Sequence, residues 1–319
     1  LERLLHGLGA GTTGYTPLDP PTAVLVLDDA AMSGSPGDAL FARLTAAAAY
    51  SYDADFWALL PRQYGAATAR AGWQLFRGEP PSVWPRDPHY LMYRKAMHST
   101  FESLCKDDGR RACVSWRAQL LTGLADQSLQ RLARTAVDEA LRLPYRDEPV
   151  GDSDEDPVPA RARPALRVVP EMRDLALKLR AKGFDVWLFS SSSQYAALEA
   201  ARLYGVDPSR VVGVRQKVAD GVVTASLLQP IPLGEGLAEA VTFYLGRPPD
   251  LAVGSADDRA LLDYDDGTGV RVLLAAPDQV PPDAARRGWK VQPPFSPSRG
   301  PQQESELLPP PSVPPGGGT

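Results

Sequence analysis

Short apolar runs alternate with longer amphipathic segments along most of this chain, a pattern typical of an α/β fold. Residues 22–27 form a buried-strand run rich in Val and Leu. Further strands are predicted at 184–189, 211–214 and 251–253, with a hairpin turn at Asp220-Gly221. Helices are predicted across 38–143, from Pro170 to Gly183 and over 237–245. Because strands that alternate with helices pair in parallel, the pattern predicts a doubly wound parallel sheet, whose ligands bind beyond the carboxyl ends of its strands.

Two segments interrupt this pattern. Residues 145–164 carry four acidic residues over 152–156 among prolines, and we expect a solvated linker there. Residues 291–319 contain nine prolines and four glycines, a composition that cannot bury enough apolar surface to order itself. The sequence therefore predicts a disordered Pro/Gly-rich tail. The alternative is a polyproline-II docking site for a protein partner near Pro309-Pro310-Pro311.

Charge and hydropathy exclude some classes of protein. The 319 residues hold 34 Lys and Arg against 39 Asp and Glu, a net charge of −5. Binding to nucleic acid requires a basic excess, so we expect no nucleic-acid partner. No apolar run approaches the roughly 18 residues of a membrane span, so the chain is not expected to be transmembrane.

Polar loops follow three of the predicted strands. Asp28-Asp29 follows the first strand, a serine loop at 190–193 follows the second, and Gly254-Ser255-Ala256-Asp257-Asp258 follows a later one. Carboxylates and hydroxyls at neighbouring strand ends suit a magnesium-dependent phosphoryl site, since Mg²⁺ takes carboxylate and phosphate oxygens.

These loops and the segments around them resemble the haloacid dehalogenase (HAD) superfamily, in particular its phosphorylcholine-phosphatase-like and phosphoserine-phosphatase-like members. The resemblance covers roughly residues 1–290. It is carried by 170–175 (PEMRDL), 183–190 (GFDVWLFS), 204–207 (YGVD) and 212–215 (VGVR). It implies a Rossmann-like core, residues 1–45 plus 163–290, with a mostly helical cap and the acidic linker, residues 46–162, inserted after the first strand.

In such phosphatases the first loop supplies a nucleophilic aspartate and, two residues later, an aspartate acting as acid and base. The segment Gly34-Ser35-Pro36-Gly37-Asp38-Ala39 fits the continuation of that loop. In this register Asp28 takes the acid/base position, and the nucleophile position is occupied by Val26. In the alternative register Asp28 is the nucleophile, and Ala30 replaces the acid. Either register lacks one carboxylate of the pair.

The other three loops match unevenly. Ser190, with Ser191 beside it, matches the hydroxyl that binds the phosphoryl group. Leu237 occupies the position of the charge-neutralising lysine. Ser255 replaces a metal-binding aspartate, so that Asp28 with Asp257 or Asp258 is the remaining candidate metal set.

Cys105 and Cys113 are the only cysteines, and a turn at Asp108-Gly109 can bring them together. The resemblance to phosphatases that include exported proteins favours a disulfide over two free thiols. It also favours a periplasmic or secreted location over a cytoplasmic one, as does a chain starting at Leu1 without methionine.

The sequence thus predicts a phosphatase-like protein with degenerate catalytic motifs, a pseudophosphatase with a ligand-binding or interaction role, and we lean against an active enzyme. One alternative is a weak Mg²⁺-dependent phosphomonoesterase acting on a small phosphorylated metabolite such as phosphocholine. Another is a scaffold whose proline-rich tail captures a protein partner. No cofactor is expected, other than Mg²⁺ if activity remains.

Overall fold

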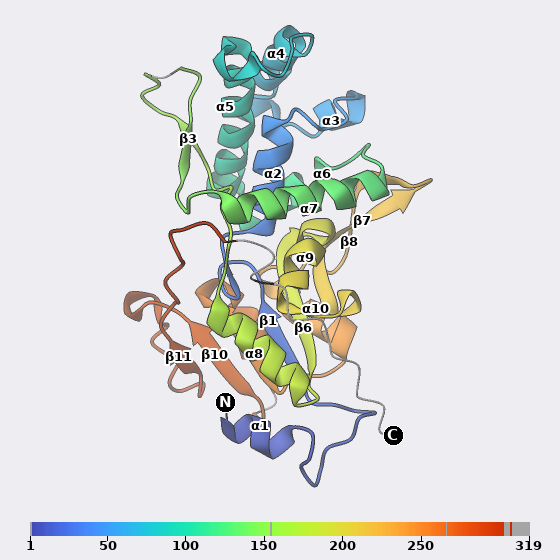
Figure 1. The fold of residues 1–319 in the computed structure, drawn as a ribbon, viewed down its shortest axis with the longest axis vertical. Helices are drawn as coiled ribbons and strands as arrows, with labels where there is room; N and C mark the ends of the chain where they lie inside the picture. The colour runs from blue at the N-terminus through green and yellow to red at the C-terminus, as the bar shows by residue number, and fades with distance from the viewer. Residues whose placement is uncertain (1, 154, 266, 303–306, 308–319) are drawn as a thin grey trace, which may run out of the picture.

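The structure, a computed structural model, describes residues 2–153, 155–265, 267–302 and 307 (Figure 1). Seven strands form one sheet in the order β11-β10-β9-β1-β6-β7-β8. The strands are β1 (Thr22–Val26), β6 (Asp185–Ser193), β7 (Val211–Ala219), β8 (Val222–Leu228), β9 (Leu251–Ser255), β10 (Val270–Leu274) and β11 (Lys290–Gln292). All neighbours pair in parallel except β7 and β8, which form the hairpin expected at Asp220-Gly221.

The predicted α/β class is confirmed: a mostly parallel sheet is flanked by helices. These helices are α8 (Pro170–Ala181), α9 (Gln194–Ala201), α10 (Glu235–Leu245) and α11 (Arg259–Asp263). A short α1 (Glu2–Leu8) lies at the N-terminal end, and β2 (Met32–Ser33) pairs with β5 (Arg167–Val168). The five residues of β1 are buried along the whole strand, because β6 and β9 flank it on both sides.

A helical part separates β1 from β6 in the sequence and lies beyond one end of the sheet (Figure 1). Its helices are α2 (Pro36–Ala46), α3 (Ala54–Ala58), α4 (Ala66–Phe76), α5 (Pro88–Ser103), α6 (Arg110–Gln119) and α7 (Asp126–Arg142). A π-helical turn, Leu104–Asp108, joins α5 to α6. The expected cap boundaries at residues 46 and 162 fall at the end of α2 and the end of β4 (Ala160–Ala162).

Helix α7 joins the two parts. Its residues Leu129 and Ala133 belong to the hydrophobic cluster of the helical part, whereas Val137 and Leu141 belong to the cluster of the sheet. One amphipathic helix therefore packs on both cores and fixes the helical part against the strand ends. None of the described helices is both long and apolar enough to span a bilayer.

The prediction of a serine loop at 190–193 is wrong. Residues 190–193 continue β6, and Ser193 still pairs with Val214 of β7 after an irregularity that follows Phe189. All four serines are buried. Serine has a low strand propensity, and here tertiary pairing overrides it.

The expected solvated linker at 145–164 is also structured. Strands β3 (Glu148–Val150) and β4 form an antiparallel hairpin with Val150, Ala160 and Ala162 buried in it. Lys95 of α5 pairs with Asp156 at 2.7 Å and with Asp152 at 3.1 Å. Ion pairs with the helical part therefore hold this segment in place, although its composition alone predicts a solvated polar linker.

The predicted disordered tail is wrong as far as residue 302. Strand β11 adds to the sheet edge, and the buried Arg167 donates from Nε to the Ser298 carbonyl oxygen at 2.9 Å. The Gln302 side chain accepts from the Val168 N–H at 2.9 Å and donates to the Val168 carbonyl at 3.1 Å. Backbone pairing at β11 and the hydrogen bonds to Arg167 and Val168 together order this segment. Residues 308–319, including Pro309-Pro310-Pro311, lie outside the described residues.

Candidate functional site

The pairing of β1 with β6 brings two predicted site residues together. The register aligns Val26 with Phe189, and the Leu27 N–H donates to the Phe189 carbonyl oxygen at 2.8 Å. The residues that follow, Asp28 and Ser190, consequently lie side by side, just beyond the carboxyl end of β1 and where β6 continues past it. This is where ligands of such sheets bind.

The Asp28 carboxylate accepts hydrogen bonds from four donors of its own chain. Its Oδ1 accepts from the hydroxyls of Ser35 at 2.9 Å and Ser192 at 2.7 Å. Its Oδ2 accepts from the Ser190 hydroxyl at 2.5 Å and from the Ser191 backbone N–H at 2.9 Å. We call these five residues the Asp28 cluster. With two donors on each oxygen and only 3% of the residue exposed, the carboxylate has its acceptor sites filled internally.

The sequence placed Ser190 and Ser191 at this site but did not assign Ser35 and Ser192 a role. The Ser192 hydroxyl also accepts from the Gly37 N–H at 2.7 Å, and this hydrogen bond joins the start of α2 to β6. Ser191 contributes its backbone N–H to Asp28. The alternation of side chains along β6 explains this arrangement, because residues 190 and 192 point to the same face of a strand.

The residues that stand where the resemblance expects a catalytic group lie in the hydrophobic core. Val26 is 4% exposed and packs in the cluster of the sheet, as do Ala30 and Leu237 of α10. Asp28, and not Val26, is the residue that faces Ser190. In either register, therefore, Asp28 is the carboxylate of the first loop that contacts the candidate phosphate-binding serine.

The acidic loop after β9 has internal partners as well. Asp258 Oδ2 accepts from the Ser255 N–H at 2.7 Å and from the Ser255 hydroxyl at 2.8 Å, forming a capping box. Burial raises the pKa of Asp258 to about 6, and the hydrogen bonds from Ser255 act in the opposite direction. Asp257 is exposed and forms an ion pair with Arg110 of the helical part.

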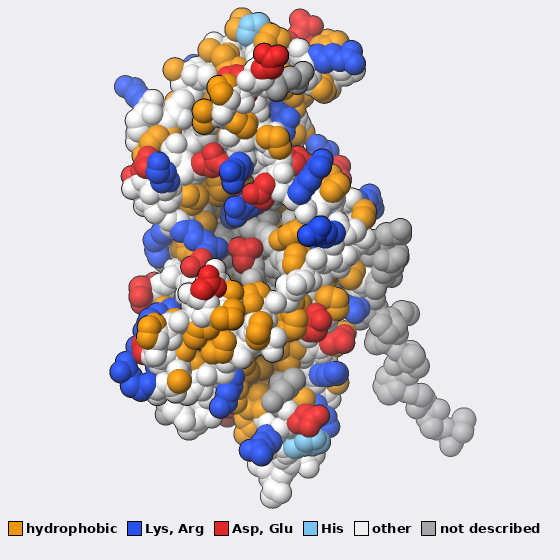
Figure 2. Space-filling view, turned by 90° about the vertical axis from the view of Figure 1, so that its left-hand side faces the viewer, with side chains coloured by type: hydrophobic (Ala, Val, Ile, Leu, Met, Phe, Trp, Pro, Cys, Tyr) orange, Lys and Arg blue, Asp and Glu red, His pale blue; other side chains and the backbone are white. Residues whose placement is uncertain are grey.

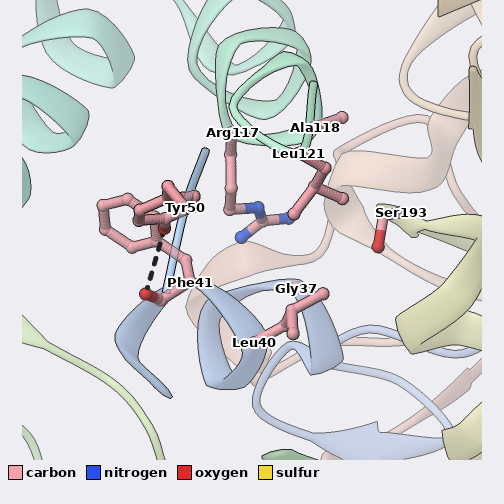
Figure 3. Close-up of a pocket in the computed structure, with 8 residues that line it drawn as sticks. All are labelled: Gly37, Leu40, Phe41, Tyr50, Arg117, Ala118, Leu121 and Ser193. Carbon is pink, nitrogen blue, oxygen red and sulfur yellow. Dashed lines mark hydrogen bonds between the residues drawn. The ribbon is translucent and has the colours of Figure 1, made fainter. Parts of the chain in front are cut away.

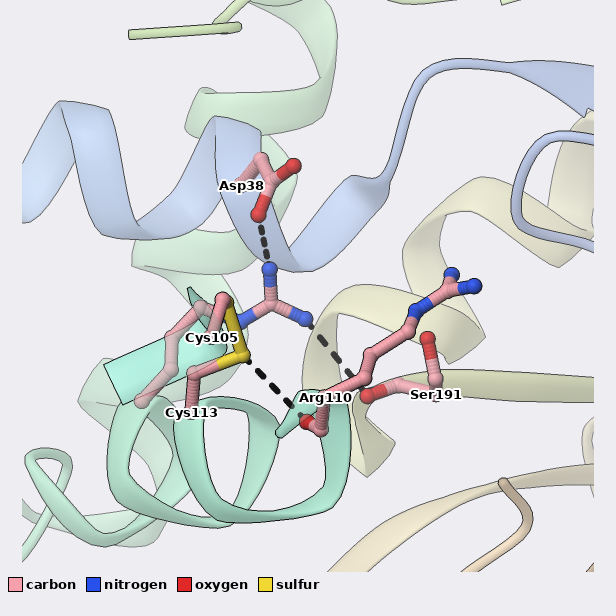
Figure 4. Close-up of a disulfide and its surroundings, with 6 residues drawn as sticks. Asp38, Cys105, Arg110, Cys113 and Ser191 are labelled. Carbon is pink, nitrogen blue, oxygen red and sulfur yellow. Dashed lines mark hydrogen bonds and ion pairs between the residues drawn. A yellow bond between two sulfur atoms is a disulfide. The ribbon is translucent and has the colours of Figure 1, made fainter. Parts of the chain in front are cut away.

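Two arginines of α6, neither of them singled out by the sequence, reach from the helical part to the strand ends. Arg110 pairs with Asp257 and lies 3.9 Å from Asp29. Arg117 pairs with Asp38 and donates to the Ser191 carbonyl oxygen at 3.5 Å (Figure 4). Seven residues separate them, close to two helical turns, so both project from one face of α6. That spacing is the signal in the sequence that could have identified them.

Arg117 is buried in the contact between the two parts. Figure 3 shows its guanidinium pointing toward α2, between Tyr50 and Ser193. The cavity there measures about 10 Å³, room for roughly one water molecule. A side chain at Gly37 would collide with the Arg117 guanidinium. Burial raises the pKa of Asp38, and the positive charge of Arg117 acts against that rise.

The predicted disulfide is confirmed. Cys105 and Cys113 are joined by an S–S bond of 2.05 Å with their Cα atoms 5.0 Å apart (Figure 4). The closed loop contains Arg110, and the Arg110 carbonyl oxygen lies 3.3 Å from the Cys113 sulfur. The covalent bond therefore fixes the backbone that carries the arginine over Asp29 and Asp257.

The candidate metal residues do not fit Mg²⁺. Asp28 is filled by hydrogen-bond donors, Asp258 is engaged by Ser255, and Asp257 is paired with an arginine. Within residues 2–302, leaving out 154 and 266, no group of three His, Cys, Asp or Glu side chains could hold a metal ion. We therefore derive no chemical step through a metal.

Comparison with known proteins supports the fold. The sequence matches no protein-family model and no curated protein. A conserved protein of unknown function from Anaerococcus prevotii DSM 20548 is similar over 86% of this chain and 84% of its own, with 18% identity and a TM-score of 0.73. A protein of unknown function from Bordetella pertussis Tohama I matches 86% of this chain and 98% of its own, with 16% identity and a TM-score of 0.52.

A HAD family hydrolase from Salmonella enterica serovar Typhi overlaps less well, with 12% identity and a TM-score of 0.44 over 84% of this chain and 66% of its own. The assignment of the fold rests on the topology instead. The first strand lies inside a mostly parallel sheet, and a helical insertion follows it. This is the Rossmann-like architecture with a helical insertion that the resemblance implies.

Proposed function

We propose that this protein is a phosphatase-like pseudoenzyme of HAD-like fold that does not turn over phosphate esters efficiently and has a ligand-binding role. One observation carries the proposal: the Asp28 carboxylate uses its acceptor sites on Ser35, Ser190, Ser191 and Ser192. A carboxylate that attacks phosphorus needs a free lone pair directed at the substrate. To supply one, Asp28 would have to leave hydrogen bonds made by buried groups.

The first loop also lacks a carboxylate two residues from Asp28 on either side, because Val26 and Ala30 stand there. In the register set by residues 34–39 the nucleophile position is Val26, whose side chain is part of the hydrophobic core. Removal of a nucleophile from a set of residues that act together lowers turnover by several orders of magnitude. The Asp28 hydroxyl partners then have a structural role, since they join β1, α2 and β6.

The charges around the cluster support the same proposal. Leu237, at the position of the lysine, is 1% exposed and places no cation there. Arg110 instead brings a positive charge between Asp29 and Asp257. The protein itself therefore neutralises the acidic loops. In the phosphatases that the sequence resembles, a bound cation would neutralise them.

The test is phosphate release from the purified full chain, incubated with Mg²⁺ and either phosphocholine or p-nitrophenyl phosphate. We expect no turnover above the same reaction without protein. Two variants test whether any phosphate release comes from the Asp28 cluster. Ser190→Ala removes the hydroxyl that contacts Asp28, and Ser191→Ala removes the neighbouring hydroxyl, leaving its N–H in place. Turnover that Ser190→Ala abolishes and Ser191→Ala retains would refute the proposal.

One observation favours a second candidate, a weak Mg²⁺-dependent phosphomonoesterase. Asp28 and Ser190 are in contact at 2.5 Å, so the two surviving groups of the resemblance are adjacent. In the alternative register Asp28 would be the nucleophile, with Ser190 binding the phosphoryl oxygens and Asp257 or Asp258 beside them. The outcome described above, turnover dependent on Ser190, is the result that this candidate predicts.

A further inference from the structure

A cleft opens between the helical part and the hairpin, apart from the Asp28 cluster. Its volume is about 550 Å³, and its walls come from α2, α5, the turn after α5, and β4. Figure 2 shows a hollow at the level where the helical part meets the sheet part, with basic and acidic side chains around it. We call it the His98 cleft. Clefts of about 300–1,000 Å³ are the usual size for small-molecule sites.

One wall of the His98 cleft is aromatic. Phe41 and Phe101 have ring centroids 5.4 Å apart, with their planes inclined by 35°. The His98 imidazole meets Phe41 edge to face at 5.0 Å. Flat apolar groups pack favourably against such rings in offset or edge-on geometry.

His98 has an unused hydrogen-bonding atom in this wall. The residue is 2% exposed, and its Nε2 has no hydrogen-bond partner among the described residues. Burial lowers the pKa of His98 to about 3, so the imidazole is neutral and can exchange one hydrogen bond. Since buried polar atoms are nearly always paired, an unpaired one on a side chain that lines a cleft points to a ligand atom.

The rim of the His98 cleft is basic. Lys106 and Arg161 line it, and neither forms an ion pair within the described part of the chain. Arg163 pairs only with Asp147, at 3.3 Å. The carboxylates that also line the cleft have partners.

Asp38 is paired with Arg117, whereas Glu102 accepts from the neutral backbone N–H of Arg161 at 2.9 Å and keeps its charge. Lys106 and Arg161 against the single charge of Glu102 leave a net positive charge, which favours an anion.

We propose that the His98 cleft binds an organic anion that carries its carboxylate or phosphate on an aromatic ring. The anionic group lies against Lys106 and Arg161, the ring packs on Phe41 and Phe101, and a polar atom of the ligand pairs with His98. This inference rests on the ligand-binding role proposed above but is independent of the loss of turnover, because Asp28 and Ser190 do not line the cleft.

The experiment is isothermal titration calorimetry of the full chain with p-nitrophenyl phosphate, p-nitrobenzoate and inorganic phosphate. We expect saturable binding of at least one aromatic anion, at least tenfold tighter than inorganic phosphate. Lys106→Ala and Arg161→Ala should each weaken it about tenfold or more, since each removes a charge-assisted contact. Lys178→Ala, an exposed lysine of α8 outside the cleft, is the matched control and should bind as the parent does.

His98→Phe tests the polar contact. It should weaken binding of the aromatic anion about tenfold, and the melting temperature shows whether the variant is folded. The inference is overturned if neither aromatic anion binds, if inorganic phosphate binds as tightly, or if the lysine and arginine variants bind as the parent does. Loss of binding in Ser190→Ala with retention in Lys106→Ala would place the ligand at the Asp28 cluster and also overturn it. Hydrolysis of the bound p-nitrophenyl phosphate would refute the pseudoenzyme proposal alone.

Discussion

The Asp28 cluster contacts the start of α2, Asp38 and Phe41 of the same helix line the His98 cleft, and both regions contain buried polar groups. In the Asp28 cluster each carboxylate oxygen has two donors, all from the chain itself. In the His98 cleft the imidazole Nε2 has no partner, and two cations at the rim have no counter-ion among the described residues.

This contrast separates polar groups that stabilise a fold from polar groups that are available to a ligand. A satisfied buried network rigidifies the structure around it, and its loss leaves several donors unpaired. An unsatisfied group costs stability until something binds. The Asp28 cluster, where the sequence predicted the catalytic residues, is the region whose carboxylate is fully hydrogen-bonded within the chain. The predictions below test whether the two regions really differ in this way.

The largest expected effect is that of Asp28→Ala. The substitution leaves three hydroxyls and one buried N–H without their acceptor, and we expect a loss of about 3 kcal/mol in the free energy of unfolding. Urea denaturation measures it. Asp28→Asn should lose less, because its amide oxygen still accepts from two donors. A loss below about 1 kcal/mol for the alanine variant would contradict a structural role for the cluster.

Asp258→Asn is expected to change the pH dependence of stability. Burial raises the pKa of Asp258 to about 6 in the folded protein, above the ordinary value of 3.8. The folded state therefore holds this proton more tightly, and stability is lost as pH rises from about 4 to 6. The asparagine variant should be more stable than the parent by about 2–3 kcal/mol at pH 7.5 and equal to it near pH 4. Denaturation curves at both values measure this, and a difference independent of pH would contradict it.

Removing the disulfide should loosen the wall of the His98 cleft, which Cys105 lines. Replacing both Cys105 and Cys113 by alanine opens the loop between them, whose ends are 8 positions apart in the sequence. Closure of so short a loop stabilises by about 2–3 kcal/mol in the chain-entropy model. Thermal unfolding of the double variant should match that of the parent under reducing conditions. If the parent and the double variant unfold alike without reductant, the bond has no stabilising effect.

The smallest expected effect is that of His98→Phe on stability. The substitution removes an unpaired buried polar atom and keeps a ring, so the free energy of unfolding should change by less than about 1 kcal/mol or increase. His98→Asn is the control, since it keeps polar atoms in the wall and loses ring contacts, and it should be less stable. A loss of several kcal/mol in the phenylalanine variant would mean that His98 is satisfied by the protein itself.

Much of the sheet could be predicted from the sequence. The apolar runs of β1, β6 and β9 identify buried parallel strands because such strands are hydrophobic on both faces. The hairpin at Asp220-Gly221 followed from turn chemistry. Strand β11 could not be found this way, since Lys290–Gln292 are all exposed and carry no alternation. Its order comes from backbone pairing, which does not require a recognisable pattern of side chains.

The candidate site was predicted in its location and only partly in its contents. Position after the predicted strands pointed to Asp28 and to the serines at 190–193, and the resemblance singled out Ser190. The cysteine spacing was compatible with the disulfide. Arg117 was missed, because its spacing from Arg110 indicates a shared helix face but does not show that this face turns toward a half-buried Asp38. The roles of Ser35 and Ser192 depend on the approach of α2 to β6, a contact between residues 157 apart in the chain.

The position of β1 has a consequence for the order in which the chain acquires its structure. Its neighbours β6 and β9 are synthesised much later, after the entire helical part. The helical part is built from local contacts, which form early, whereas pairing β1 requires closure of a long loop. Until Asp185–Ser193 has emerged, the four apolar residues of β1, Ala23 to Val26, have no strand to pair with. Assembly of the protein therefore passes through a stage with an unpaired hydrophobic strand, the kind of surface that chaperones protect.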